Sequence, residues 1–304
     1  GIFVFLVELG MIVALVNRAG GSAAFGRWAT KNIKSKTGAL LATFLLGILI
    51  FIDDYFNCLT VGSVMMPVTD SKKISRAKLA YIIDSTAAPV CMIAPISSWA
   101  AAVSSYAEEG KGLELFISAI PYNFYSILTL VFVVAICIMK FDYGSMRIHE
   151  RNAIENGDLF STDKRVGGDE VFTNPRGRVM DLILPVVILV VISVIGLLYV
   201  GGFFGVDAWG GTDYAGDFIG AFGNTDAFIG LPWGGLISLF FVMFYFIIRR
   251  VITFKEAMEC IPKGFIAMVP AITILTLAVA LKNMINLLGA DIFFEGIMTG
   301  AAAS

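Results

Sequence analysis

The stretch Phe51-Ile52-Asp53-Asp54-Tyr55-Phe56-Asn57 places two adjacent carboxylates at the end of a long apolar run, residues 40–52. A charged side chain at the centre of a bilayer costs roughly 2.5–3.5 kcal/mol on insertion scales, so such residues usually serve a function. We therefore interpret Asp53 and Asp54 as a site for a cation, a proton or both. The alternative is that the pair marks a helix end at the water boundary.

Composition indicates an integral membrane protein. Apolar residues make up 58% of the 304 residues and charged residues 15%, whereas soluble domains have about 45–50% and about 25%. We expect an all-α polytopic membrane protein that is embedded in the lipid bilayer. Basic tracts with interleaved aromatic residues are absent, which argues against nucleic acid as a partner. Both ends of the sequence lie in apolar runs and predict a fragment truncated at both ends.

The cysteines and the single histidine indicate neither a cofactor nor a resident metal. Cys58, Cys91, Cys137 and Cys260 are isolated from one another, and His149 falls in a polar stretch. Metal-binding motifs with paired Cys or His spacing do not occur, nor does a nucleophile elbow. We therefore expect no cofactor and no enzymatic activity.

Apolar runs of about 20 residues predict the membrane spans. They occur at residues 2–16, 79–106, 115–139, 179–200, 218–248 and 264–281, with a further run from residue 285. Lys and Arg gather in residues 17–37, 71–78, 140–178 and 249–263, which predicts that these links are cytoplasmic. Residues 107–114 and 201–217 are acidic and are expected outside.

The same charge pattern requires residues 39–68 to enter and leave the membrane on one side. Each arm of this region has about 14 residues, too few for a full straight crossing. We predict a re-entrant helical hairpin with its tip at residues 53–57, and two compact full crossings remain the alternative. Residues 1–139 would then form a first transmembrane half, 140–178 a cytoplasmic linker loop, and 179–304 an incomplete second half.

A second polar group interrupts the run at residues 79–106, at Asp84-Ser85-Thr86-Ala87-Ala88-Pro89. Pro89 cannot donate a backbone N–H, and its ring disfavours helical geometry in the residue before it. A helix broken here would expose carbonyl oxygens beside Asp84, Ser85 and Thr86, the ligand type of discontinuous transporter helices. The alternative is a proline kink with Asp84 at the interface.

Other polar residues within apolar runs are secondary candidates for the ion site. Thr60 follows the acidic pair on the second hairpin arm, where its hydroxyl could instead bond its own helix. Asn224, Thr225 and Asp226 form either a second broken-helix site or a polar entrance. Lys282 could reach an interface or act as a counter-charge to a carboxylate.

These motifs resemble the NhaC family of bacterial Na⁺/H⁺ antiporters. The resemblance is carried by Phe51-Ile52-Asp53-Asp54-Tyr55-Phe56-Asn57, by Ile74-Ser75-Arg76-Ala77-Lys78-Leu79-Ala80-Tyr81 and by Asp84-Ser85-Thr86-Ala87-Ala88-Pro89, and more weakly by Ala221-Phe222-Gly223-Asn224-Thr225-Asp226-Ala227. It implies a transporter fold with inverted repeats, each with a re-entrant hairpin and an interrupted helix. A hairpin for the second repeat is not found before Ser304.

The residues and the resemblance together predict exchange of Na⁺ for H⁺ by alternating access across the bacterial cytoplasmic membrane. Na⁺ would bind at Asp53, Asp54 and Asp84, and a proton would compete for the same carboxylates. The alternative is Na⁺-coupled exchange or symport of an organic anion, such as malate or lactate, or of an amino acid. A homo-oligomer is also compatible with the sequence.

Overall fold

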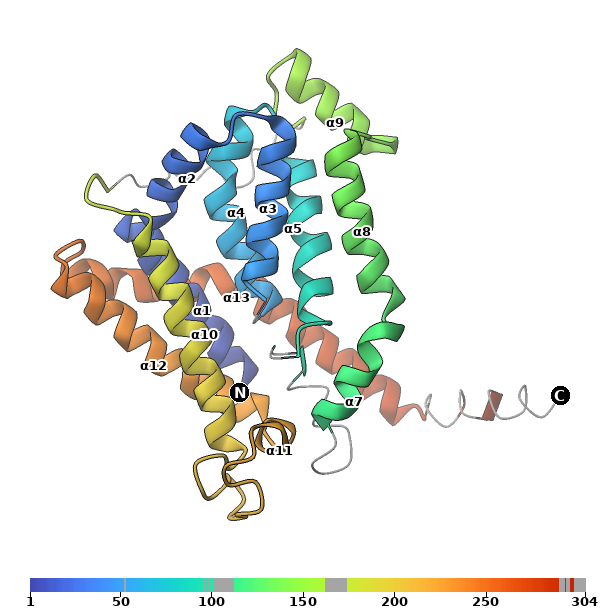
Figure 1. Ribbon diagram of the computed structural model, residues 1–304, viewed down its shortest axis with the longest axis vertical. Helices are drawn as coiled ribbons and strands as arrows, with labels where there is room; N and C mark the ends of the chain where they lie inside the picture. The colour runs from blue at the N-terminus through green and yellow to red at the C-terminus, as the bar shows by residue number, and fades with distance from the viewer. Residues whose placement is uncertain are drawn as a thin grey trace.

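The computed structural model describes residues 1–51, 53–95, 97, 99–100, 112–161, 174–289, 293 and 296–297. All regular structure in this part of the chain is helical (Figure 1). Four of its helices are long and apolar enough to cross a membrane, in the ranges Phe124–Glu155, Met180–Val200, Phe228–Ile248 and Phe254–Ile285. The bent pair Phe3–Ala19 and Gly21–Asn32 makes a fifth candidate span. The predicted all-α polytopic membrane class is confirmed.

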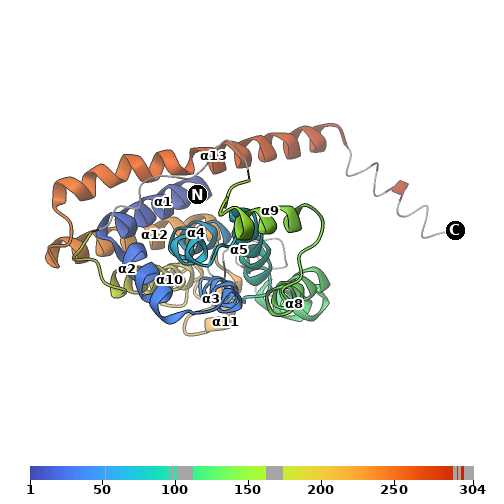
Figure 2. The same ribbon diagram turned by 90° about the horizontal axis from the view of Figure 1, so that it is seen from above.

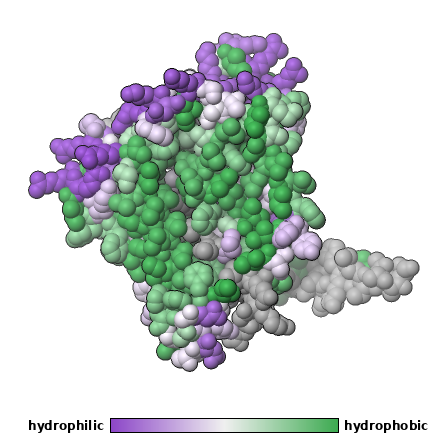
Figure 3. Space-filling model, viewed as in Figure 1, coloured by the Kyte–Doolittle hydropathy of each residue, from purple (hydrophilic) through white to green (hydrophobic). Residues whose placement is uncertain are grey.

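Surface hydropathy follows the same pattern. Apolar residues cover the middle of the visible face in Figure 3, while hydrophilic residues gather at its top and at its lower end. Many large apolar side chains are exposed, for example Leu128, Ile195 and Phe241. They lie on α8 (Phe124–Met139), α10 (Met180–Val200), α12 (Ala227–Ile248) and α13 (Phe254–Leu287). Such a belt is what a lipid-facing surface requires, since the bilayer is as apolar as the protein core.

The helices have the following bounds: α1 Ile2–Ala19, α2 Gly21–Asn32, α3 Lys36–Leu49, α4 Asp54–Ser71, α5 Arg76–Cys91, α7 Gly112–Ala119, the 3₁₀ turn η1 Ile120–Tyr122, α8 Phe124–Met139, α9 Gly144–Glu155, α10 Met180–Val200, α11 Phe218–Gly223, α12 Ala227–Ile248 and α13 Phe254–Leu287.

The two short arms predicted between residues 39 and 68 correspond to α3 and α4, which pack against each other. Ser35 begins α3 by accepting a hydrogen bond from the Gly38 N–H at 2.9 Å. The start of α3 and the end of α4 lie together at the top of Figure 1, and their junction lies part-way down the molecule. This is hairpin geometry, and its depth in the membrane remains a prediction.

The predicted helix break at residues 84–89 is wrong. Helix α5 runs without interruption from Arg76 to Cys91 and contains Pro89 in its last turn. A proline so close to a helix end removes one helical hydrogen bond, to the carbonyl of Ser85, and does not stop the helix. The interruption lies further on: α5 ends at Cys91, and helical backbone returns at Trp99. The end of the predicted span, residues 101–106, lies outside the described residues.

Ser97 joins the two sides of this later interruption. Its hydroxyl donates to the carbonyl of Cys91 at 2.7 Å, at the end of α5, and accepts from the N–H of Ala100 at 3.1 Å. One side chain therefore caps the end of one helical segment and the start of the next, which satisfies backbone groups that the break leaves exposed.

The helices form two groups that do not follow the predicted halves of the sequence. Helices α3, α4, α5 and α8 pack together, whereas α1 packs mainly against α12 and α13, near α10. Figure 2 shows α1 beside α13, away from α8. The predicted link at residues 17–37 contains α2, which contacts both α4 and α10 and is bent by 62° from α1. Gly20, with φ 80°, makes that bend.

The linker at residues 140–178 is not the simple loop that we predicted, because residues 144–155 form α9. Glu150 of α9 is 2% exposed and accepts a hydrogen bond from the Ser75 N–H at 2.7 Å. It also pairs with Lys36 and lies 4.0 Å from Lys78, whose ammonium contacts Asp142 at 2.6 Å. These bonds attach α9 to the starts of α3 and α5.

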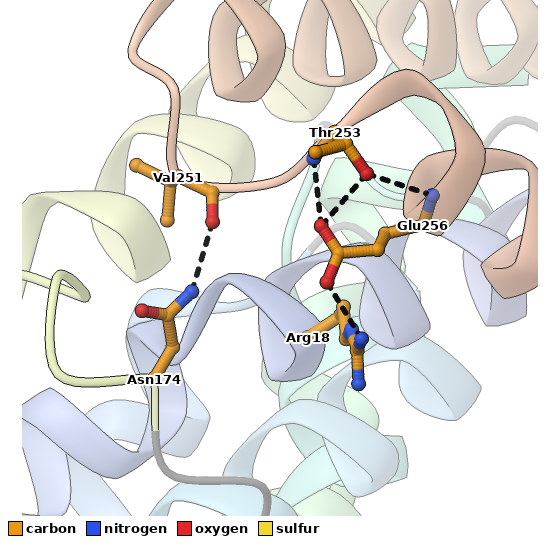
Figure 4. Close-up of polar contacts among 5 residues, drawn as sticks. All are labelled: Arg18, Asn174, Val251, Thr253 and Glu256. Atoms are coloured by element: carbon orange, nitrogen blue, oxygen red, sulfur yellow. Dashed lines mark hydrogen bonds and ion pairs between the residues drawn. The ribbon is translucent and has the colours of Figure 1, made fainter.

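Polar contacts also connect helix ends in the group formed by α1, α10, α12 and α13. Arg18 at the end of α1 pairs with Glu256 of α13 at 2.6 Å, and Glu256 accepts hydrogen bonds from Thr253 (Figure 4). Asn174 donates to the carbonyl of Val251 at 2.9 Å in the same view.

The predicted span at residues 218–248 is not one helix. Residues 224–226 divide it into α11 and α12.

Replacing Glu150→Gln should lower the free energy of unfolding by about 3 kcal/mol, because it leaves the buried Lys78 with one fewer compensating charge. Thermal unfolding of the purified protein in detergent measures the change. The matched control is Arg151→Gln, which removes an exposed pair with Glu155 one turn away and should cost at most about 0.5 kcal/mol. Equal effects of the two substitutions would contradict the importance assigned to the Glu150 contacts.

The loop at residues 201–217 should loosen in acid. The N–H groups of Gly211 and Trp209 and the Asn224 amide bond the Asp207 carboxylate and lower its pKa. A folded-state pKa below the unfolded one adds stability at higher pH, which is lost as pH falls through the lowered value. We expect an acid transition in tryptophan fluorescence that is absent in Asp207→Asn. If the wild type and Asp207→Asn show the same acid transition, the transition arises from a group other than Asp207.

Candidate functional site

The candidate site is the tip of the α3–α4 hairpin, where Asn57 closes the junction. Its side-chain nitrogen donates to the carbonyl of Gly47 at 2.6 Å and to that of Ile50 at 2.9 Å. These carbonyls lie at the end of α3, where helical N–H donors run out. Asn57 is fully buried, so a side chain of α4 supplies the hydrogen bonds that α3 lacks at its end.

Those two bonds fix the orientation of the Asn57 amide. A flipped amide would place its oxygen against two carbonyl oxygens, so the nitrogen must face them. The remaining oxygen, Oδ1, is buried and has no hydrogen-bond partner. An unsatisfied buried acceptor is costly, at about 1–3 kcal/mol, and a cation would satisfy it.

Helix α5 meets the tip at Thr86. A Cβ atom added to Gly47 would lie 2.9 Å from the Thr86 methyl and 3.6 Å from Asn57 Oδ1, so these three residues are immediate neighbours. Thr86 is buried, and its hydroxyl donates to the Ile82 carbonyl at 2.6 Å. The hydroxyl oxygen keeps lone pairs that a cation could use.

Both acidic residues lie at the junction of α3 and α4, the predicted hairpin tip: Asp53 directly precedes α4 and Asp54 begins it. Asp53 is 3% exposed, and its carbonyl accepts from the Asn57 N–H at 3.0 Å. Asp54 begins α4 and accepts a hydrogen bond from the Trp99 indole at 3.2 Å. The positive end of the α4 dipole faces these residues and favours negative charge there.

Asp84 lies near the tip and on a more open face. Its side chain is exposed and Ser85 is half-buried. The Cys58 thiol interacts electrostatically with Asp53, Asp54 and Asp84, which places all three acids around the first turns of α4. Because Pro89 has no N–H, the carbonyl of Ser85 lacks its usual helical donor.

The three carboxylates do not form one ligand set. Within the described residues, no three His, Cys, Asp or Glu side chains are close enough to hold a metal ion. A cation at this tip would therefore combine carboxylate oxygen with neutral oxygens such as Asn57 Oδ1. Hard cations accept carboxylate, amide, hydroxyl and carbonyl oxygens together.

Thr60 belongs to a different region. It lines a cavity of about 10 Å³ between α1, α2, α4 and α10, together with Asn17, Ser22 and Ser63. Its hydroxyl is buried without a hydrogen-bond partner. A space of that size holds about one water molecule.

The residues at 224–226 make structural contacts. Asn224 donates to Asp207 at 3.0 Å, Thr225 donates to the carbonyl of Leu197 at 2.7 Å, and Asp226 accepts from the N–H of Phe228 at 2.7 Å. These bonds attach the loop at residues 201–217 to α10 and cap the start of α12. They favour the structural interpretation over a second ion site. The side chain of Lys282 lies outside the described residues.

Sequence reasoning missed two residues. Gly47 is a point of close approach between α3 and α5, and only its small size within an apolar run could have indicated this. Glu8 is a buried carboxyl in α1. Its signal was the presence of an acid in the apolar run at residues 2–16.

Comparison with known proteins agrees with a membrane transporter. The pattern of the Na⁺/H⁺ antiporter family matches residues 100–304, about two-thirds of the sequence. The chain belongs to the Na⁺/H⁺ antiporter family. A Haemophilus influenzae protein, described as uncharacterized, is 33% identical over 308 residues. That alignment covers 98% of this chain and 57% of the relative, so the chain spans little more than half of the relative's length. No solved structure matches the chain.

The family assignment confirms the resemblance noted in the sequence, at the level of the family. The matched range begins at residue 100, whereas the hairpin tip and Asp84 precede it. The match to the antiporter family therefore covers the later part of the chain, and the interest of the hairpin tip as a candidate site rests on its geometry.

Replacing Gly47→Ala should destabilise this family member by about 1–3 kcal/mol, because the added methyl overpacks the contact with Thr86. If a cation binds beside Asn57 Oδ1, the added methyl should also weaken its binding by displacing that oxygen. The matched control is Gly62→Ala in α4, whose Cβ would meet only Ile83, at 3.8 Å. Thermal unfolding in detergent with and without Na⁺ measures both effects. An equal response of the two variants would contradict the tight contact.

Proposed function

We propose that the protein exchanges Na⁺ for H⁺ at the tip of the α3–α4 hairpin. The observation that carries the proposal is the buried Asn57 Oδ1, fixed in orientation and without a hydrogen-bond partner. It lies one helical turn from Asp53, which is also buried. A carboxylate beside a neutral oxygen suits a small hard cation.

Competition between the two ions would follow from the carboxylate. When ionised, Asp53 holds Na⁺ together with Asn57 Oδ1 and oxygens of α5; when protonated, it carries no charge with which to retain the cation. Na⁺ binding would therefore release a proton, and proton binding would release Na⁺. Asp54, which accepts a hydrogen bond from Trp99, and the more exposed Asp84 would attract cations to the tip, since all three acids lie near enough to Cys58 to interact with it electrostatically.

Alternating access would use the two helix groups. The tip belongs to α3, α4 and α5, while α1, α10, α12 and α13 form the other group. Movement of one group against the other would open the tip to each side in turn, as in transporters with discontinuous helices. We propose that the protein lies in the bacterial cytoplasmic membrane. We also propose that it needs no cofactor; Na⁺ and H⁺ are the ions that it transports.

The test uses the intact protein in sealed proteoliposomes that carry a pH-sensitive dye. Addition of Na⁺ alone should move protons, and Asp53→Asn should reduce the rate about 10- to 100-fold, since it removes a charged ligand worth about 1.5–3 kcal/mol. The control Asp213→Asn alters an exposed residue of the loop at 201–217 and should transport normally.

Two results would contradict the proposal. Normal exchange by a folded Asp53→Asn variant would remove the tip from the mechanism. Silence with Na⁺ alone, followed by proton movement once lactate, malate or an amino acid is added, would replace simple exchange by Na⁺-coupled transport of that solute.

A further inference from the structure

Helix α1 carries a carboxyl group that the proposed Na⁺ site does not use. Glu8 lies in the middle of the apolar sequence Ile2–Ala19 and is 4% exposed. Its neighbours one turn away on the same helix, Phe5 and Ile12, are fully buried. An ionisable residue inside a membrane helix is a functional candidate by default.

The carboxyl faces α12 at a glycine. A Cβ atom added to Gly235 would lie 2.3 Å from Glu8 Oε2 and 3.0 Å from the Phe5 ring. The carboxyl thus occupies the space that any side chain at position 235 would fill. Helix α13 closes the adjacent face, because a Cβ added to Gly10 would lie 2.4 Å from the Gly264 carbonyl oxygen.

Protein groups do not compensate this carboxyl within the described residues. Glu8 Oε2 is buried without a hydrogen-bond partner, and no Lys or Arg side chain in the described part of the chain pairs with it. A buried carboxylate with so little compensation is strongly disfavoured.

Apart from Arg27 and Lys263, whose side chains are exposed, the charged residues on the helices around α1 lie near helix ends. On α10, Asp181 pairs with Arg249 at the end of α12, and residues 227–248 of α12 contain no charged side chain. The other charged residues of these elements are Arg27 and Lys31 on α2, Asp54 and Asp70 at the two ends of α4, and Lys255, Glu256, Glu259, Lys263 and Lys282 on α13.

A proton is the occupant that fits this site. A metal cation needs several oxygen ligands, whereas the Glu8 carboxyl faces the Phe5 ring and the backbone at Gly235. A proton neutralises the carboxyl and needs no further ligand. We propose that Glu8 is a second proton-binding site, which gains and loses a proton during the transport cycle.

The position of α1 connects this site to the hairpin. Helix α1 packs against α12 and α13 on the side of Glu8, and it also contacts α4. One turn beyond Glu8, Ile12 lines the small cavity that contains Thr60 of α4. Movement between the two helix groups would therefore change the surroundings of α1. The inference rests on the proposed exchange function, since the proton at Glu8 would move with Na⁺ binding at the tip.

The test is infrared difference spectroscopy of the intact protein, with and without Na⁺. We expect a protonated-carboxyl band that responds to Na⁺ and is lost in Glu8→Gln. The number of protons released per Na⁺, from calorimetry in two buffers of different ionisation enthalpy, should fall by about one. The control Glu259→Gln removes an exposed carboxylate of α13 and should change neither quantity.

The outcomes separate this proposal from the exchange function. If Na⁺ releases no proton in the wild type, the exchange function fails. If it does, and Glu8→Gln leaves both the band and the proton count unchanged, the Glu8 proposal alone is overturned. A Glu8 band that does not respond to Na⁺ would also overturn the Glu8 proposal, and Glu8 would then have only a structural role. If Glu8→Gln does not fold, Glu8→Asp is used in its place. We then expect the protonated-carboxyl band to shift, and an infrared difference spectrum identical to that of the wild type would overturn the proposal.

Discussion

The carboxamide of Asn57 joins the two arms of the hairpin and thereby shapes the tip. By donating to two carbonyls at the end of α3, it satisfies backbone groups that have no helical partner and no access to water. The same two bonds determine which atom of the amide faces α5. The Asn57 side chain therefore closes the hairpin and at the same time leaves its own oxygen without a hydrogen-bond partner. Gly47, whose small size allows α3 to approach α5 closely, lies beside that oxygen.

Much of the fold was predictable because the membrane restricts the possibilities. Composition alone identified a helical membrane protein, and the basic links on both sides of residues 39–68 indicated a hairpin with its acids at the tip. The proline at position 89 was misleading because its effect depends on its place in the helix. Near the end of α5 it removes one hydrogen bond, and the sequence does not reveal where the helix ends.

Other features depend on contacts between residues far apart in the sequence. Residues 144–155 look like a polar loop, yet they form α9 because Glu150 finds Lys36, Lys78 and Ser75. Similarly, α1 was assigned to the first half because of its position in the chain, whereas its packing partners are α12 and α13. Glu8 was overlooked for the same reason, since its burial is created by Gly235, more than 200 residues away.

The pairing of α1 with α12 and α13 has a consequence for biosynthesis. A ribosome makes α1 before its two main partners, so α1 must enter the bilayer before they exist. During that interval Glu8 faces lipid or the insertion machinery, at a cost of roughly 2.5–3.5 kcal/mol for an acid at the centre of a span. The surrounding Phe, Leu, Ile and Val residues of α1 offset this cost. Packing of α1 into this part of the bundle then waits for the arrival of α12 and α13.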